Sequence, residues 1–287
     1  MSPKPKKDED GRRFRLDWLG YLGFVGLLGF FWETLRPFRI LTLLCLFFLF
    51  PYRKNLRFFF QIVCYALGQM VAVCRVRGRL PRPGRYSQKA SLTLPFAGFW
   101  VVESGGVERK DSHSWNVFNQ RYAYDFLVKD EEGKTHRHEG RVLEDYYSFG
   151  QAILSPADGL VMQTRDGIRD NPRLGSIDVQ ARTFQGNFIV IRHAQGEYIY
   201  LAHLKEGSLV VKPGDLVKRG QTIGRCGNSG HSTEPHLHFQ VQDRGSFNSA
   251  IGLPVEFSAF VLQKGGQAHE VTSGYLTKGQ VIKNKKT

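Results

Sequence analysis

The chain has 287 residues, enough for one large domain or two small ones, and a formal net charge of +14 at pH 7. The charge is uneven, because residues 1–82 hold 15 Lys and Arg against 5 Asp and Glu, a net of +10 that leaves +4 for the remainder. A nucleic-acid-binding domain needs basic residues and stacking aromatics on one folded face. Because the basic excess lies in the N-terminal part, we exclude nucleic acid as a partner.

The N-terminal part is also rich in apolar residues. Uncharged stretches run over residues 18–32, 40–52 and 58–74. A bilayer span takes about 20 apolar residues, so each stretch taken singly is marginal. The middle stretch, however, lacks the polar face that a soluble amphipathic helix would show. We therefore expect residues 1–82 to form a basic N-terminus and an α-helical anchor in contact with membrane lipid. A compact soluble helical domain is the alternative.

The topology of this anchor is only partly fixed by the sequence. A signal peptide would end in a small-residue cleavage site, and none follows the first stretch, so we expect the anchor to be retained. The basic N-terminus should stay in the cytoplasm. Arginines follow all three stretches, which leaves the number of crossings open. An odd number of crossings would place the C-terminal domain outside the cytoplasm, and an even number would keep it inside. We expect an integral cell-membrane protein with this domain outside the cytoplasm.

The pattern of apolar and polar residues changes after the anchor. Adjacent Pro and Gly near residue 83 indicate a linker. From Ser91 onward, short alternating runs are broken by glycine, which is typical of strands, and no long helical period follows. We expect a linker and first strands over 83–118, a folded domain over 119–260, and a polar C-terminal tail over 261–287. The fold should be mainly β, an antiparallel sandwich or barrel-like domain.

Histidines near the end of this domain suggest a metal site. His236 and His238 are two residues apart, and side chains at that spacing share one face of a strand. His203 lies upstream, and Asp125 further upstream. Three imidazoles and a carboxylate that converge are the components of a catalytic zinc site with its acid and base partners. The alternative is that His236 and His238 are two surface histidines without a function.

A series of ordered blocks then resembles the lysostaphin/LytM-type zinc metallopeptidases, which have the duplicated hybrid motif fold. The blocks are Asp125, Ser155–Val161, Gly186–His193, Tyr200–Leu204, Val211–Val217, Gly220–Gly224, Gly227–Gly230 and Pro235–Phe239. The resemblance covers roughly 119–242 and implies hydrolysis of peptide bonds in bacterial peptidoglycan. It also implies that Asp125 and His238 are zinc ligands, and that His203 and His236 are catalytic, handling the water and the developing oxyanion.

The first zinc motif departs from this family. The family has His-x-Gly-x-Asp where this chain has Arg121–Asp125, with arginine at the histidine position. A guanidinium has no lone pair for a metal, so zinc would be weakly bound or absent unless another histidine substitutes. We expect His113 to be that third metal ligand. His136 and His138, in a charged segment, are weaker candidates.

The sequence thus favours a membrane-anchored zinc metalloendopeptidase with peptidoglycan peptides as substrate. The alternative is a catalytically degenerate domain that binds cell wall or regulates another hydrolase. His193 is either a support for the pocket or a satisfied strand histidine. We expect the two remaining histidines, His231 and His269, to be exposed.

Overall fold

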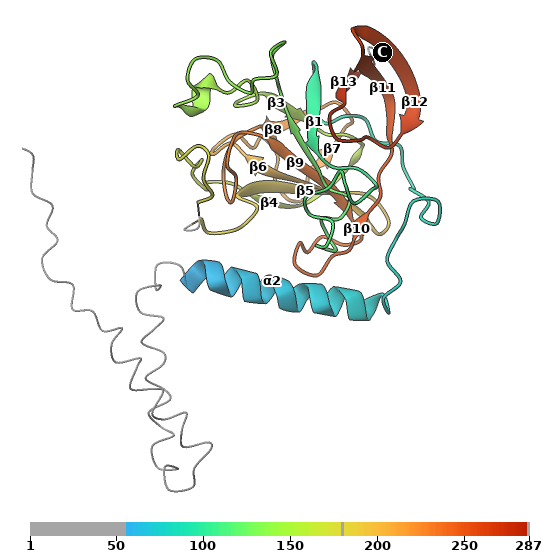
Figure 1. Ribbon diagram of the computed structural model, residues 1–287. Helices are drawn as coiled ribbons and strands as arrows, with labels where there is room; N and C mark the ends of the chain where they lie inside the picture. Colours follow the sequence, from blue (N-terminus) through green and yellow to red (C-terminus); the bar gives the residue numbers. More distant parts are fainter. Residues whose placement is uncertain (1–55, 179–180, 286–287) are drawn as a thin grey trace, which may run out of the picture. The chain divides into compact units, whose positions relative to one another are not determined.

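The computed structural model describes residues 56–178 and 181–285, and the part from Phe60 onward is one compact unit. The chain there forms helix α2, a short 3-10 helix and thirteen strands (Figure 1). In chain order they are α2 (Leu56–Arg75), β1 (Trp100–Ser104), β2 (Tyr124–Leu127), η3 (Leu143–Asp145), β3 (Ala152–Leu154), β4 (Gly159–Arg165), β5 (Asn187–Ala194), β6 (Glu197–Leu204), β7 (Leu216–Val217), β8 (Thr222–Arg225), β9 (Leu237–Gln242), β10 (Gly252–Leu253), β11 (Phe257–Lys264), β12 (Gln267–Gly274) and β13 (Val281–Asn284).

One large sheet organises the described part of the chain. Its eleven strands include a path in the order β12-β11-β13-β1-β2-β9-β6-β5-β4-β7, and β10 pairs with β9 beside that path. Strands β3 and β8 form a separate pair, and every paired set of strands is antiparallel. The prediction of a mainly β, antiparallel fold is confirmed.

Strand β9 shows how the sequence places the site on this sheet. Successive side chains of a strand point to opposite faces. Leu237, Phe239 and Val241 therefore enter the main hydrophobic core, which gathers residues from most strands. The alternate residues, among them His238 and Gln240, are also buried but face the other side. Because a shift of one residue in register would exchange the two faces, burial of the apolar set fixes where His238 points.

The polar C-terminal segment is not a tail. We expected a polar C-terminal tail over residues 261–287, but half of β11 and all of β12 and β13 lie there. Ile282 pairs with Trp100 of β1 and with Leu262 of β11, and its side chain is fully buried. The side chains of β12 are largely exposed, so its composition is polar although its backbone is paired. The polar composition of this segment therefore led us to predict a tail where β11 and β12 form a hairpin at the edge of the sheet.

The anchor prediction falls largely outside the described residues. The stretches 18–32 and 40–52 lie in the part that the structure does not describe. The third stretch lies within α2 (Figure 1). Within residues 56–178 and 181–285, no helix has the length and apolar character needed to cross a membrane.

A close backbone contact positions one edge of the site. Gly186 has φ +64°, and a Cβ there would lie 2.3 Å from the carbonyl carbon of Ser229. Ser229 Oγ accepts a hydrogen bond from the Asn187 amide at 2.9 Å and donates one to the Leu204 carbonyl at 2.7 Å. The Ser229 carbonyl in turn accepts from His203 Nδ1. Glycine at 186 thus allows the loop that orients His203 to lie against β5.

We predict that Gly186→Ala lowers the free energy of unfolding by roughly 3 kcal/mol, from left-handed backbone strain of about 1–2 kcal/mol plus a steric clash of similar size. Gly196→Ala is the matched control, because Gly196 also has positive φ but a Cβ there would meet only the Lys89 side chain, at 3.7 Å. The control should lose only the strain component. Urea unfolding of both variants measures the difference. Equal losses would contradict the importance of the Gly186–Ser229 contact.

Candidate metal and catalytic site

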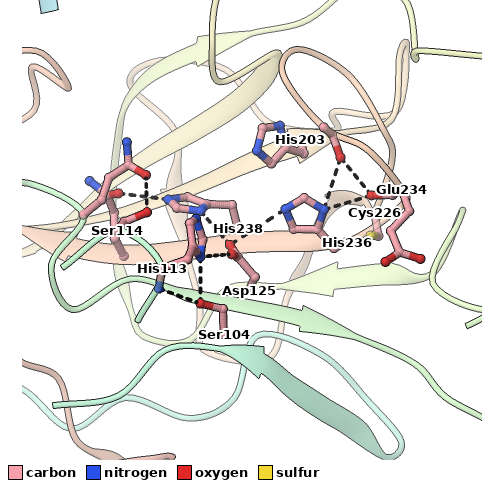
Figure 2. A network of polar contacts seen from close by, with 12 residues as sticks. Ser104, His113, Ser114, Asp125, His203, Cys226, Glu234, His236 and His238 are labelled. Atoms are coloured by element: carbon pink, nitrogen blue, oxygen red, sulfur yellow. Dashed lines mark hydrogen bonds and ion pairs between the residues drawn. The ribbon is translucent and has the colours of Figure 1, made fainter. Parts of the chain in front are cut away.

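Asp125 and His238 form the centre of the candidate site. They lie directly opposite each other on the paired strands β2 and β9. Asp125 Oδ1 is 2.8 Å from His238 Nδ1, and His238 Nε2 is 2.9 Å from Gln240 Oε1 (Figure 2). Burial disfavours both charged groups, but this hydrogen bond outweighs it. It lowers the pKa of Asp125 far below its usual range and raises the pKa of His238 above its ordinary value.

A chain of side-chain amides fixes the orientation of His238. Gln240 Nε2 donates to Gln242 Oε1 at 2.5 Å, and Gln242 Nε2 donates to the Arg244 carbonyl at 2.8 Å. With its nitrogen used in this way, Gln240 presents its oxygen to His238. His238 Nε2 therefore carries a proton, and Nδ1 is directed at the Asp125 carboxylate.

His203 stands beside this pair at the end of β6. Its Nδ1 donates to the Ser229 carbonyl at 2.8 Å, so the neutral imidazole keeps its lone pair on Nε2. Burial, and then the neighbouring His236 and His238, lower the pKa of His203 well below its ordinary value. The residue also has φ +60°, a conformation uncommon for a residue other than glycine and often found at functional sites.

His236 has the same tautomer as His203. Its Nδ1 donates to the Glu234 carbonyl at 2.8 Å, and its Nε2 lies 3.8 Å from Asp125 Oδ1. The ring centroids of His203 and His236 are 4.8 Å apart. A backbone carbonyl thus accepts the Nδ1 proton of each imidazole, and Nε2 is the remaining ring nitrogen of each.

His113 lies beside the other oxygen of Asp125. Its Nδ1 is 3.4 Å from Asp125 Oδ2 and 2.7 Å from Ser104 Oγ on β1 (Figure 2). The side chain remains 62% exposed. The structure therefore brings His113 to the carboxylate that the sequence analysis paired with it.

Arg121 contacts other groups. Its Nε donates to the Trp115 carbonyl at 3.0 Å. The guanidinium carbon lies 5.2 Å from the Trp115 ring centroid and 5.6 Å from that of Phe118, at the distances of cation–π contacts. These contacts hold the guanidinium against two aromatic rings, and Arg121 lines neither of the pockets described below.

Two pockets adjoin the histidines, and both are lined by His113, Asp125, Thr233 and His236. One, of about 480 Å³, we call the aromatic pocket; its further lining includes Ile62, Tyr65, Phe184 and Phe247. The other, of about 330 Å³, we call the charged pocket; its further lining includes Glu103, Lys110, Asp111, Glu234 and Lys278. The Asp125 cluster thus lies where two chemically different pockets meet.

These side chains supply the donor types that zinc prefers, imidazole nitrogen and carboxylate oxygen. In the described part of the chain, however, no group of three or more His, Cys, Asp or Glu side chains is arranged to hold a metal ion. Instead, Asp125 forms a hydrogen bond with His238. The donor chemistry fits zinc, and loading would require His238 Nδ1 to exchange its proton for the metal.

The remaining histidines lie in varied surroundings. The buried His193 side chain lies on β5 with Nε2 3.0 Å from Glu197 Oε2, its Nδ1 has no hydrogen-bond partner among the described residues, and it lines neither pocket. His136 packs on Tyr146 outside both pocket linings, and His138 is exposed. His269 is exposed on β12, as expected. His231, which we expected to be exposed, is half-buried against Phe184 and lines the aromatic pocket.

The sequence analysis missed the contribution of α2 to the site. Tyr65 and Ile62 line the aromatic pocket, although both lie in a stretch that we assigned to the anchor. Tyr65 donates a hydrogen bond to Asn119 Oδ1 and accepts one from Gln120 Nε2 at 3.0 Å. The available signal was the spacing of Gln61, Tyr65 and Gln69, which places three polar groups along one face of the helix.

Comparison with known proteins identifies the domain. Residues 137–249 match Peptidase family M23, a range that includes His203, His236 and His238 but not Asp125. The chain is 44% identical over 173 residues to the peptidoglycan DD-endopeptidase ShyC of Vibrio cholerae, covering 50% of this chain and 38% of that protein. It is 30% identical over 116 residues to ShyA of the same organism, covering 40% and 23%.

Lysostaphin of Staphylococcus simulans is also similar, with 51% identity over 47 residues that cover 16% of this chain and 10% of that protein. The chain therefore contains an M23 peptidase domain, and the resemblance drawn from its motifs is confirmed. In each of these three alignments the chain spans at most 38% of the relative's length.

We predict that the histidines of the metal-free protein titrate in a fixed order. His203 should lose its charge well below a pH of about 6.5, the ordinary imidazole value, and His238 above it. The cause is burial without a carboxylate partner for His203, against the Asp125 hydrogen bond for His238. Side-chain NMR titration of the protein in chelator measures this order. The reverse order would contradict the hydrogen-bond assignments.

Proposed function

We propose that this chain is a zinc-dependent endopeptidase that cleaves peptide bonds of bacterial peptidoglycan. The observation that carries the proposal is the convergence of His203, His236 and His238 with Asp125 at the junction of two pockets. Similarity to peptidoglycan endopeptidases over part of their length supports the substrate class.

Asp125 and His238, with His113 as third ligand, would hold the zinc ion. Bound zinc would lower the pKa of a water molecule to about 7 and polarise the scissile carbonyl. Gln240 would keep the proton of His238 on Nε2, which leaves Nδ1 available as a ligand; such outer contacts fix the tautomer of a metal-binding histidine.

His203 and His236 would move protons during the reaction. Both donate from Nδ1 to a backbone carbonyl, so Nε2 is the atom of each that would accept a proton from the reaction. The lowered pKa of His203 keeps it unprotonated near neutral pH, as a general base requires. After proton transfer, the carbonyl partners would stabilise the imidazolium that forms.

The two pockets suit a chain-like substrate. A peptide lying across the Asp125 cluster would place one side of the scissile bond against apolar and aromatic groups and the other against charged groups. Ionised carboxyl and amino groups of a stem peptide would find partners in the charged pocket, which carries both signs of charge.

We further propose that the N-terminal stretches attach the chain to the cell membrane with the M23 domain outside the cytoplasm. The support is the apolar character of residues 18–32 and 40–52, with basic residues on both sides. The domain lies outside the cytoplasm when an odd number of the N-terminal stretches crosses the membrane. Peptidoglycan lies outside the cytoplasm, so the proposed activity requires this side.

A second candidate function is a degenerate domain that binds cell wall or regulates another hydrolase. Arg121 at the first ligand position favours it, because this side chain cannot bind a metal. Metal content separates the two functions, since only the enzyme needs zinc.

We predict that the purified protein takes up zinc weakly, approaching one equivalent when the metal is in excess. His238→Ala should abolish uptake, and His113→Ala should weaken it. His203→Ala should retain the metal but lower hydrolysis of purified peptidoglycan by about 10²- to 10⁴-fold, the usual contribution of a general acid or base. Elemental analysis and release of peptide fragments measure the two properties.

His269→Ala is the control, because this exposed histidine on β12 should affect neither property. Absence of zinc uptake by the wild type in excess metal would exclude the enzyme and leave the degenerate domain. Restoration of uptake by Arg121→His would then show that only the first ligand had been lost.

A further inference from the structure

Helix α2 meets the β domain with its polar side. Gln61 Nε2 donates to the Ala181 carbonyl at 3.0 Å, and Gln69 Nε2 donates to the Asn248 carbonyl at 2.8 Å. Tyr65, midway between them, bonds to Asn119. Gly68 lies so close to Asn248 that a Cβ would come within 2.5 Å of its carbonyl oxygen. Specific polar contacts and close packing thus fix which side of α2 faces the domain.

The opposite side of α2 is apolar and exposed. Phe60, Cys64, Leu67, Val71 and Cys74 follow one another at intervals of three or four residues, so they form one stripe along the helix. Phe60, Leu67 and Val71 are 57%, 56% and 61% exposed, and Met70 beside them is 63% exposed. A helix on a soluble domain normally turns its apolar side inward. Here the arrangement is reversed, which indicates a partner for the outward stripe.

The charges near the stripe indicate what that partner is. No Asp or Glu occurs between residues 34 and 102, while Arg53, Lys54 and Arg57 precede or begin the helix. Beyond its end, Arg77 and Arg79 are exposed. An apolar helical face flanked by arginine and lysine is typical of helices that lie in the surface of an anionic bilayer.

We propose that α2 lies flat on the membrane, with the stripe in the boundary between headgroups and acyl chains and the flanking cations on anionic lipid headgroups. A second copy of the chain would bring like charges together. The chain's own apolar stretches, 18–32 and 40–52, would cover the stripe without any use for the cations. Anionic lipid satisfies both features.

This docking has a consequence for the site, because the same helix lines the aromatic pocket. Ile62 and Tyr65 belong to that lining, and Tyr65 also holds Asn119 and Gln120, which precede Asp125. A membrane-bound α2 therefore fixes the pocket beside the bilayer surface. The docking itself does not depend on peptidase activity, and the test below does not measure activity.

The native cysteines allow a direct test in the full chain. Cys64 lies on the stripe, Cys226 is buried, and Cys45→Ser and Cys74→Ser leave Cys64 as the single accessible thiol for a fluorophore. In vesicles of phosphatidylglycerol and phosphatidylcholine, nitroxide-bearing lipid should quench this probe several-fold more strongly than aqueous iodide does. Leu216→Cys in a chain with Cys45, Cys64 and Cys74 replaced by Ser is the matched control. Leu216, on β7, is 79% exposed, so a probe there should show the opposite preference.

Three outcomes would overturn the proposal. Quenching by iodide would place the stripe in water, and protection from both quenchers would mean that the protein's own residues cover it. A disulfide between two Cys64 residues under mild oxidation, without lipid quenching, would mean a second copy. The N-terminal stretches alone could attach the chain to the vesicles. The experiment therefore measures the depth of the Cys64 probe in the bilayer and not the binding of the protein to vesicles.

Variants of the surface supply the second arm of the test. Val71→Glu should lower lipid quenching of the Cys64 probe several-fold, and Arg77→Glu with Arg79→Glu should do so only in vesicles that contain phosphatidylglycerol. Lys212→Glu, at an exposed lysine outside α2 and its flanks, is the control for charge. Unchanged melting temperatures would show that the variants fold. Unchanged quenching in both charged variants would refute a role for the stripe and the arginines.

Discussion

The hydrogen bond between Asp125 and His238 is the interaction on which the site depends. It joins β2 to β9 at one register position, and it neutralises two buried charges that burial alone would disfavour. A buried ion pair is stabilising only when the remaining hydrogen-bonding groups are satisfied. The amide chain from Gln240 to Gln242 provides that satisfaction on the side away from Asp125. Sheet register, charge and tautomer are thus set together.

The other catalytic candidates depend on the same sheet. Ala202, next to His203, pairs directly with His238 across β6 and β9, so the two histidines are one residue apart in the ladder. The unusual backbone of His203 then turns its ring toward Ser229, in the loop that packs on Gly186. Backbone packing between two loops therefore controls the side chain proposed to act as the base.

Helix α2 links the chemistry to the N-terminal part of the chain. Its polar side supports the segment that leads to Asp125 and supplies a wall of the aromatic pocket. Its apolar side remains exposed on the described domain. One side of α2 thus lines a pocket of the proposed site, and the opposite side is the surface proposed to contact the membrane.

Sequence by itself determined the features that depend on local spacing. The alternation around His236 and His238 and the ordered glycine blocks identified the strands, the M23 domain and four of the histidine and aspartate side chains that cluster. These patterns are readable because strand periodicity and tight turns leave a mark within a few residues. Tertiary structure decided what strand periodicity does not record: the distance between His113 and Asp125, the stacking of Arg121 on Trp115, and the place of β13 between β1 and β11. It also decided which side of α2 faces the domain, since an apolar stripe has the same period whether protein, water or lipid lies against it.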